Sequence, residues 1–243
     1  MEQFLRTQLL IGEDGLEKLS KSRVAVFGIG GVGGFVVEAL ARAGVGAIDL
    51  IDNDTVSKTN LNRQIIALHS TIGKNKTELA KERILDINPE CGVTVHNLFY
   101  LPETAEKIDV SDFDYVVDAV DTVTAKLHLI EKTKKKGVPI ISSMGTGNKL
   151  DPTLFKVSDI FETNTDSLAR VIRKELKKRG IDSLKVVYSE EKSVRADKKL
   201  LEKTMEKELG EGSSRRDVPG SISFVPSVAG LIIASEVIKD LLK

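Results

Sequence analysis

Cysteine and aromatic residues are scarce in this sequence. Its 243 residues include one Cys and no Trp, and aromatic residues make up 5% of the chain. A single Cys excludes a disulfide scaffold and any zinc site made of cysteines alone, and it agrees with the reducing cytoplasm, where we expect the protein. The shortage of aromatic rings argues against base stacking as the main way of binding a nucleic acid.

Net charge is absent as well, although the charges are unevenly placed. Lys and Arg total 36, and Asp and Glu total 36. The stretch 170–179, RVIRKELKKR, nevertheless holds six bases against one acid. Further bases follow at Arg195, Lys198, Lys199, Lys203, Lys207, Arg215 and Arg216. Such runs are usually solvated helix faces; the alternative is a site for an anionic polymer.

Uninterrupted hydrophobic segments are also missing. Residues 218–235 carry no charge, but they contain two prolines, two glycines and four serines. A membrane-spanning helix needs about 20 mostly apolar residues without such breaks, so we predict a core strand at 221–225 and a buried helix at 227–242. The first residues carry charge throughout their apolar stretch, so we expect neither a signal peptide nor a membrane partner.

Short apolar runs alternate with stretches of helical periodicity up to residue 147. Strands are predicted at 22–28, 47–51, 93–98, 115–119 and 138–142, and helices at 33–44, 74–88 and 124–136. This alternation predicts an α/β protein with a Rossmann-like, doubly wound and mostly parallel sheet.

The alternation of predicted strands and helices becomes less regular after residue 147. Strands are predicted near 153–157 and 184–188, and helices near 165–179 and 197–209, with a polar, glycine-rich loop at 210–217. No internal repeat is visible. We therefore expect one domain over 1–243, in which a nucleotide-binding core at 1–147 is followed by a C-terminal extension of mixed strands and helices at 148–243 that binds the substrate and closes the fold.

A glycine-rich turn joins the first predicted strand to the first predicted helix. Its glycines are Gly28, Gly30, Gly31 and Gly33. Glycines at such a turn let the backbone approach a phosphate, which the amides of the helix N-terminus can bind. Asp52 ends the next strand, where an acid can hold ribose hydroxyls. This pattern indicates an adenine nucleotide without deciding which one.

The polar residues after Asp52 separate an ATP-using enzyme from a dinucleotide dehydrogenase. The carboxyl ends of parallel strands meet at one crevice, so side chains that follow different strands converge there. Those expected at this crevice are Asn60, Arg63, Gln64, Lys76 and Asp121. Cations that clamp phosphate oxygens and an acid that can hold Mg²⁺ suit a triphosphate, whereas hydride transfer does not require them.

These motifs together identify a family. The order GxGGxG, DxDxVxxxNLxRQ, GxxK and DxxD over about residues 6–147 resembles the ThiF- and MoeB-type adenylyltransferases related to ubiquitin-activating enzymes. The resemblance implies ATP and Mg²⁺ as cofactors. It implies that Gly30 and Gly31 line the nucleotide and that Asp52 holds the ribose. It assigns the phosphates to Asn60, Arg63, Gln64 and Lys76, and it makes Asp121 the magnesium ligand and reaction-centre acid.

The N-terminal segment adds an expectation about assembly. Arg6 precedes the apolar residues 9–11 on a short segment before the first strand. In the resembling family the matching arginine reaches across a two-fold interface to the partner's triphosphate. The resemblance therefore implies a homodimer in which each site borrows Arg6 from the other subunit. The alternative is that Arg6 is an ordinary surface residue.

The only thiol is not expected to act as a nucleophile. Cys91 lies between a predicted helix and the next strand, which places it at the end of the sheet opposite the crevice. The paired CxxC motifs of many protein-activating relatives are absent. An acyl-adenylate formed here must then react with an external nucleophile or with a group of the substrate itself.

The whole chain resembles one branch, the tRNA threonylcarbamoyladenosine dehydratases. Beyond the shared core, the resemblance rests on Arg6 with residues 10–12, on the glycines of 145–147, on the basic stretch and on RRDVPGS at 215–221. It implies ATP-dependent cyclisation of threonylcarbamoyladenosine in tRNA through adenylation of the threonyl carboxylate. The proposed RNA contacts are Lys149, Arg170, Arg173, Lys174, Lys177, Lys178, Arg179, Arg215 and Arg216.

Two alternatives remain at this stage. One is an adenylyltransferase that activates the C-terminus of a sulfur-carrier protein. Such an enzyme would have a sulfur-donor or sulfur-acceptor protein as its partner. The other is a non-catalytic nucleotide-binding scaffold, which should lack one of Arg63, Lys76 or Asp121; all three are present. The three scattered histidines are expected to be structural, and only His69, near Arg63, would merit a test.

Overall fold

A computed structural model describes residues 2–209 and 218–243 and is built on one seven-stranded sheet. The strand order is β3-β2-β1-β4-β5-β7-β6, and only β6 runs antiparallel to its neighbour. The strands are β1 (Arg23–Phe27), β2 (Ala47–Asp52), β3 (Gly92–Asn97), β4 (Tyr115–Asp118), β5 (Ile140–Ser143), β6 (Phe155–Asp159) and β7 (Lys185–Ser189). The predicted α/β class and mostly parallel sheet are confirmed.

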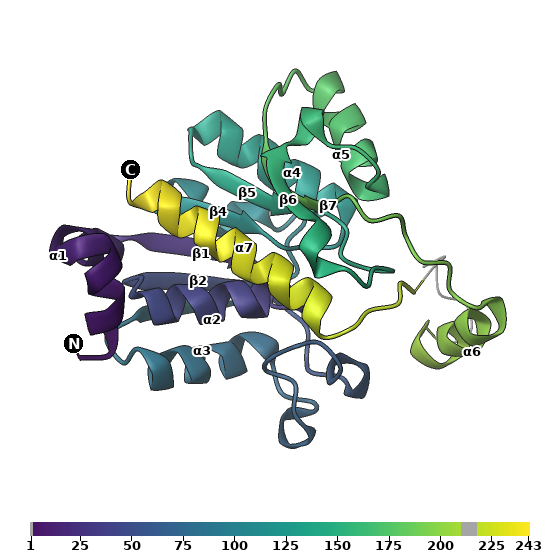
Figure 1. The fold of residues 1–243 in the computed structure, drawn as a ribbon, viewed down its shortest axis with the longest axis horizontal. Helices are drawn as coiled ribbons and strands as arrows, with labels where there is room; N and C mark the ends of the chain where they lie inside the picture. The colour runs from purple at the N-terminus through teal and green to yellow at the C-terminus, as the bar shows by residue number, and fades with distance from the viewer. Residues whose placement is uncertain (1, 210–217) are drawn as a thin grey trace.

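Helices cover both faces of this sheet (Figure 1). The α-helices are α1 (Leu5–Lys21), α2 (Gly33–Ala43), α3 (Lys76–Ile87), α4 (Val123–Lys136), α5 (Ser167–Lys178), α6 (Lys198–Leu209) and α7 (Phe224–Leu241). One face carries α2, α3 and α7, and the other carries α4 and α5. Short 3-10 turns lie at Glu2–Phe4, Lys58–Asn60, His69–Thr71, Ala105–Lys107, Val110–Asp112, Pro152–Leu154 and Ile160–Glu162.

Burial on both faces explains the apolar runs that marked the central strands. Alternate residues of β1 belong to opposite cores: Val24 and Val26 pack under α2 and α7, while Ala25 and Phe27 pack toward α4. All four are fully buried. A strand with two covered faces cannot alternate between apolar and polar residues, so its sequence is continuously apolar.

Two local predictions are wrong. The expected strand at 221–225 does not form, because the chain enters helix α7 at Phe224. Pro226 lies in the first turn of that helix, where proline's missing N–H costs nothing. The short segment expected at the N-terminus is instead the 17-residue α1, which bends at Gly12, with φ 76°. None of the helices in the described part of the chain combines the length and apolar character needed to cross a membrane.

Candidate active site

A cavity lies where the strand order reverses between β1 and β4. Its volume is about 610 Å³, and its lining comes from the segments that follow β1, β2, β3 and β4. Ligands of open α/β sheets bind at this switch point, because the connections on its two sides diverge to opposite faces of the sheet. The sequence prediction of a crevice at these strand ends is confirmed.

The glycine turn is shaped by close backbone approaches. Gly28 has φ +90°, and a Cβ there would lie 2.6 Å from the carbonyl oxygen of Ala119. A Cβ on Gly33 would lie 1.8 Å from the carbonyl oxygen of Gly28. No side chain fits at either position. Gly30 and Gly31 line the cavity itself, so the four glycines divide into two that form the turn and two that face the cavity.

Asp52 ties two phosphate-side loops together. Its Oδ2 accepts a hydrogen bond from the Ile29 amide at 2.7 Å, and its Oδ1 accepts one from the Asp54 amide at 2.8 Å. One carboxylate thus holds the glycine turn and the loop after β2 at a fixed separation. Asp52 also lines the cavity, where the predicted contact with ribose hydroxyls would use its remaining lone pairs.

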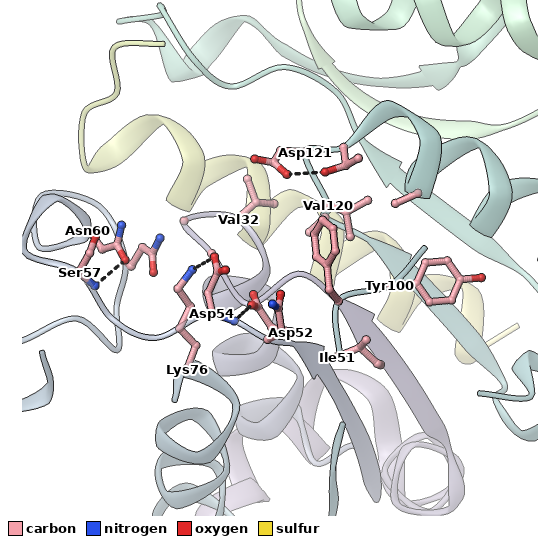
Figure 2. A pocket seen from close by; sticks show the side chains of 18 of the residues that line it. Val32, Ile51, Asp52, Asp54, Ser57, Asn60, Lys76, Tyr100, Val120 and Asp121 are labelled. Atoms are coloured by element: carbon pink, nitrogen blue, oxygen red, sulfur yellow. Dashed lines mark hydrogen bonds and ion pairs between the residues drawn. The ribbon is translucent and has the colours of Figure 1, made fainter. Parts of the chain in front are cut away.

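Lys76 is held at the cavity wall by an acid that the sequence analysis did not single out. Its Nζ lies 2.7 Å from Oδ2 of Asp54, and the Lys76 side chain is 6% exposed, whereas Asp54 is largely exposed. Figure 2 shows this pair beside Asp52. The ammonium therefore lies at the cavity and is balanced by one largely exposed carboxylate.

The turn after β2 brings three predicted residues to the same wall. Asn60 is buried, and its Oδ1 accepts a hydrogen bond from the Ser57 amide at 3.1 Å. The guanidinium of Arg63 donates to the Thr59 carbonyl oxygen at 2.9 Å. Gln64 is 7% exposed, and its Oε1 has no hydrogen-bond partner in the described structure. A buried amide oxygen without a partner costs about 1–3 kcal/mol, so a ligand that donates to it would recover that loss.

Asp121 closes the opposite side of the cavity. It follows β4 in the segment Asp118–Asp121, and its Oδ1 accepts a hydrogen bond from the Thr122 hydroxyl at 3.3 Å. Figure 2 shows Asp121 across the cavity from Asp54 and Lys76. Cationic and acidic side chains therefore lie on opposite sides of the cavity, an arrangement that suits a magnesium–phosphate complex.

An apolar wall after β3 escaped the sequence analysis. Leu98, Phe99 and Tyr100 line the cavity, and so does Thr146 from the segment after β5. Burial, with Asp118 nearby, raises the pKa of the Tyr100 phenol. Phe99 is 49% exposed although it is a large aromatic side chain. An apolar wall opposite phosphate-binding groups suits the base of a nucleotide.

Arg6 does not line the cavity of this chain. It is exposed near the start of α1, and α1 leads directly into the first residue of β1. The cavity lies at the other end of β1, beyond five residues of strand. Figure 1 shows α1 beside the start of β1.

The histidines lie outside the cavity lining. His96 Nε2 lies 2.9 Å from Oδ1 of Asp49, and His128 Nδ1 lies 3.1 Å from the Tyr100 hydroxyl. His69 is exposed on a 3-10 turn. In the described residues no group of three or more His, Cys, Asp or Glu side chains could form a metal centre.

Cys91 lies at the end of the sheet that was predicted. It immediately precedes β3, whose first residue, Gly92, pairs with Ala47, the first residue of β2. The cysteine is 4% exposed, and burial raises its thiol pKa to about 11. At neutral pH the group is a protonated thiol that no substrate at the cavity can reach.

We expect Cys91→Ser to retain turnover within about threefold, because a thiol remote from the cavity contributes nothing to the chemistry. The native protein should also react slowly with iodoacetamide at pH 8, since the thiolate is scarce well below pH 11. Steady-state kinetics and mass spectrometry of the alkylated protein check both points. A folded but inactive Cys91→Ser protein would indicate a covalent mechanism.

The basic residues predicted to contact RNA do not all face solvent. Lys149 is 5% exposed, and its Nζ donates to the Glu191 carbonyl oxygen at 3.0 Å. One guanidinium nitrogen of Arg173 donates to the carbonyl oxygens of Ile160 and Thr163 and to the Thr163 hydroxyl. These two bases hold the extension together, so we withdraw them from the proposed RNA surface.

Among the described residues, the remaining bases divide into two that form ion pairs and three on α5 for which no ion pair is seen. Lys178 and Arg179 form ion pairs with Glu175 at 2.6 and 2.8 Å. Exposed positions on α5 are occupied by Arg170, Lys174 and Lys177. Arg215 and Arg216 lie outside the described residues, as does the loop predicted at 210–217.

Comparisons with known proteins point to one family over the full length of the chain. The model of the ThiF family matches residues 4–243. The tRNA threonylcarbamoyladenosine dehydratase of Bacillus subtilis is 47% identical over 248 residues, which cover 100% of this chain and 96% of the relative. Crystal structures of the Escherichia coli tRNA N6-threonylcarbamoyladenosine dehydratase with AMP and with ATP have TM-scores of 0.87 and 0.85. Each is 35% identical and covers 99% of this chain and 94% of its own.

Proposed function

Because this chain belongs to the ThiF family, we propose that it is an ATP-dependent tRNA threonylcarbamoyladenosine dehydratase. The observation that carries the proposal is the whole-length similarity to dehydratases, one of which is known with ATP and with AMP. The cavity supplies the chemistry that such an enzyme needs: a glycine turn, two cationic side chains and an acid at one switch point. The tRNA substrate and the free cysteine agree with a cytoplasmic enzyme.

The first step forms an acyl-adenylate. An oxygen of the threonyl carboxylate attacks the α-phosphorus of ATP, the bond from that phosphorus to the bridging oxygen breaks, and pyrophosphate leaves. Arg63 and Lys76 counter the negative charge that develops on the phosphates, and Asp54 releases Lys76 for this contact. The reaction has little need of a protein nucleophile, because positioning and charge stabilisation lower most of its barrier.

Magnesium fits the acid of this site. Asp121 lines the cavity and offers hard carboxylate oxygens. Mg²⁺ prefers such oxygen ligands together with nucleotide phosphates and water. When bound, the ion would neutralise phosphate charge; Asp121 would hold it on the side of the cavity opposite Lys76.

The second step needs no thiol. The carbamoyl group of the substrate attacks its own activated carbonyl carbon, the bond from that carbon to the AMP oxygen breaks, AMP leaves, and one proton is lost. A group held within the same small ring attacks with a very high effective molarity. The protected position of Cys91 agrees with this intramolecular route.

Exposed bases on α5 form the proposed tRNA surface. Asp166 caps the N-terminus of α5 and lies against Gly145 on the cavity side of the molecule, so Arg170 is the base nearest the site. Lys174 and Lys177 continue along the helix. Basic side chains that bind the phosphates of a polyanion release its counterions. Binding is therefore strong at low salt and weakens as the salt concentration rises.

Replacing Arg170, Lys174 and Lys177 with alanine should weaken tRNA binding and reduce the slope of log affinity against log salt by about 2–3 units. ATP affinity should be unchanged, because none of the three lines the cavity. A charge-matched control replaces the exposed bases Lys18, Lys21 and Lys239, which lie near the opposite end of the sheet. Equal effects of the two triple variants on tRNA binding would remove α5 from the proposal.

Nucleoside mass spectrometry tests the function. Incubation with ATP and tRNA that carries threonylcarbamoyladenosine should convert the nucleoside into a product lighter by one water. The rival is an adenylyltransferase that acts on a sulfur-carrier protein, and a sulfur-donor or sulfur-acceptor protein would be its partner. That enzyme would leave the nucleoside intact and adenylate the carrier's C-terminus, so this outcome would replace the proposal.

A further inference from the structure

A lysine with no exposed surface lies directly behind the segment that carries Asp121. Lys126 is in the first turns of α4 and is 0% exposed. Its Nζ lies 2.7 Å from Oδ2 of Asp118, 3.2 Å from Oγ of Ser142 and 3.0 Å from the carbonyl oxygen of Ser143. These three acceptors use all three N–H groups of the ammonium.

The partners of Lys126 are buried as completely as the lysine itself. Asp118 and Ser142 are both 0% exposed, and the Ser142 hydroxyl donates to the same oxygen of Asp118 that contacts the lysine. Withdrawing two full charges from water is costly, and an apolar pair of similar volume often stabilises a fold equally well. Stability alone therefore does not explain why this position holds an ion pair.

The ion pair joins the two strands whose ends form the reacting side of the cavity. Asp118 is the last residue of β4, three positions before Asp121, and its Oδ1 accepts a hydrogen bond from the Val120 amide at 3.3 Å. Ser143 is the last residue of β5, three positions before Thr146, which lines the cavity.

The same segment also supports the glycine turn. A Cβ on Gly28 would lie 2.6 Å from the carbonyl oxygen of Ala119, so the two backbones are in direct contact. A shift of the segment after β4 would therefore move Asp121 relative to the phosphate-binding turn, as well as relative to Thr146.

We propose that Lys126 is a positioning residue for the adenylation step: with Asp118 and Ser142 it fixes the Asp121 segment against the glycine turn and the Thr146 segment. This inference rests on the proposed function, because it takes Asp121 to be the reaction-centre acid. Lys126 itself touches neither the cavity nor any reacting group in it.

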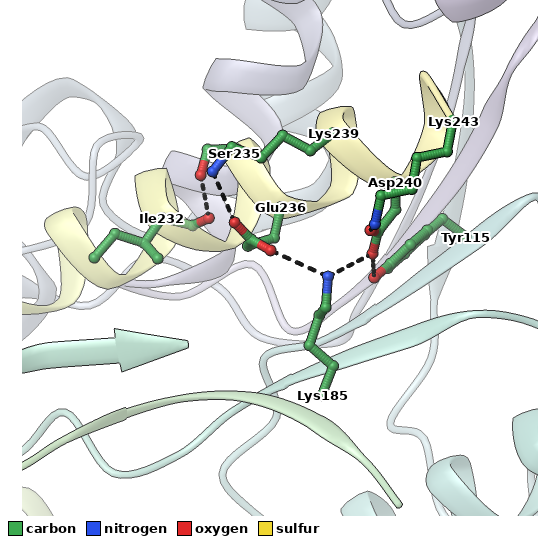
Figure 3. A network of polar contacts seen from close by, with 8 residues as sticks. All are labelled: Tyr115, Lys185, Ile232, Ser235, Glu236, Lys239, Asp240 and Lys243. Atoms are coloured by element: carbon green, nitrogen blue, oxygen red, sulfur yellow. Dashed lines mark hydrogen bonds and ion pairs between the residues drawn. The ribbon is translucent and has the colours of Figure 1, made fainter. Parts of the chain in front are cut away.

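The test variant removes both charges together, Lys126→Met with Asp118→Asn, so that no unpaired charge stays buried. The matched control is a second lysine–aspartate pair, Lys185 and Asp240, whose atoms Nζ and Oδ2 lie 2.7 Å apart where β7 begins (Figure 3). In Lys185→Met with Asp240→Asn the same two side-chain types change at the opposite end of the sheet.

The expected result is a separation of turnover from stability. The Lys126 pair variant should stay folded, with kcat for tRNA dehydration at saturating ATP and Mg²⁺ lowered about 10–100-fold, the usual loss when a supporting residue behind an active-site group is removed. The Lys185 pair variant should keep its kcat, although its melting temperature can fall. Wild-type kcat in a folded Lys126 pair variant would overturn the proposal.

A milder variant covers the case in which the pair variant does not fold. Ser142→Ala keeps both charges and removes one of the three contacts of Nζ. It should lower kcat about 3–10-fold at nearly unchanged thermal stability. Unchanged kcat in Ser142→Ala, without a folded pair variant, would overturn the proposal.

A measurement without tRNA separates this inference from the proposed function. Calorimetry should show that Mg²⁺ increases ATP affinity in wild type and in the Lys185 pair variant, whereas the Lys126 pair variant binds ATP normally in EDTA and loses most of that gain. If the wild-type protein fails to dehydrate the tRNA, the proposed function is wrong. A loss of the Mg²⁺-dependent gain in ATP affinity in the Lys126 pair variant would still support the role of Lys126. An undiminished gain in the Lys126 pair variant would contradict that role.

Discussion

Asp121→Ala should lower the rate of tRNA dehydration by about 10³-fold or more, while the protein stays folded. Asp121 lies across the cavity from Lys76 and is the acid that we propose to hold a metal against the nucleotide phosphates. Loss of one preorganised charge-stabilising group costs about 10²–10³ in kcat, and loss of a metal ligand removes the charge of the ion as well.

The control for this prediction is another exposed aspartate. Asp86 on α3 is exposed and does not line the cavity, so Asp86→Ala should have wild-type kinetics. Lys76→Ala and Arg63→Ala should each lower turnover by about 10²–10³. Quenched-flow or steady-state assays of product nucleoside measure all four variants, and circular dichroism monitors folding. Near-normal turnover by Asp121→Ala would assign the reaction-centre acid to another residue.

Mixing two inactive variants, Arg6→Ala and Asp121→Ala, should restore about a quarter of wild-type activity. We propose a homodimer in which each site receives Arg6 from the other subunit. Leu9 and Leu10, close to Arg6 on α1, are 86% and 88% exposed, which is the kind of apolar surface that a second subunit covers. An arginine supplied across an interface can raise phosphoryl-transfer rates by about 10³–10⁵.

The expected recovery follows from the symmetry of a dimer. After equal mixing and random exchange, about half of the dimers are hybrids. In each hybrid the Arg6→Ala subunit keeps Asp121 and receives an intact Arg6, so one of its two sites is complete. If Arg6 acts within its own subunit, every site lacks one essential group. Absence of recovery despite subunit exchange, measured by mass spectrometry of isotope-labelled mixtures, would exclude the exchange of Arg6.

The cavity could be predicted from the sequence because its polar residues follow apolar strands. Asp52 and Asp121 each come just after a buried run, and the ends of parallel strands meet at one edge. The apolar wall was missed because Phe99 and Tyr100, which follow β3, lack the polar groups by which the other lining residues were recognised. Only the fold shows that they face the cavity.

The charge of a residue did not predict whether its side chain faces solvent. Lys126 lies in a helical stretch among other bases, where a solvated lysine is the ordinary expectation, yet it is fully buried. Arg173 belongs to the most basic stretch of the chain, yet its guanidinium binds backbone oxygens of the neighbouring turn. The direction of a long side chain depends on which acceptors the tertiary fold brings within reach, and sequence spacing does not contain that information.

The ends of the chain gave the other errors. Residues 221–225, SISFV, have a high strand propensity, but Pro226 is well suited to the first turn of a helix, and packing of α7 on α2 and the sheet favours the helical form. Gly12 interrupts the helical periodicity of the sequence, so the residues before and after it do not predict a single helix. In both cases tertiary contacts outweigh local preference.

Pyrophosphate release from ATP tests the central claim most directly. It should be measured with purified protein and Mg²⁺ in the presence of tRNA that carries threonylcarbamoyladenosine, and compared with the same tRNA lacking the modification. Because the threonyl carboxylate is the proposed attacking group, release should be stoichiometric with dehydrated nucleoside on the modified tRNA and remain at background on the unmodified one. Equal release on both tRNAs, or release without loss of water from the nucleoside, would contradict adenylation of that carboxylate.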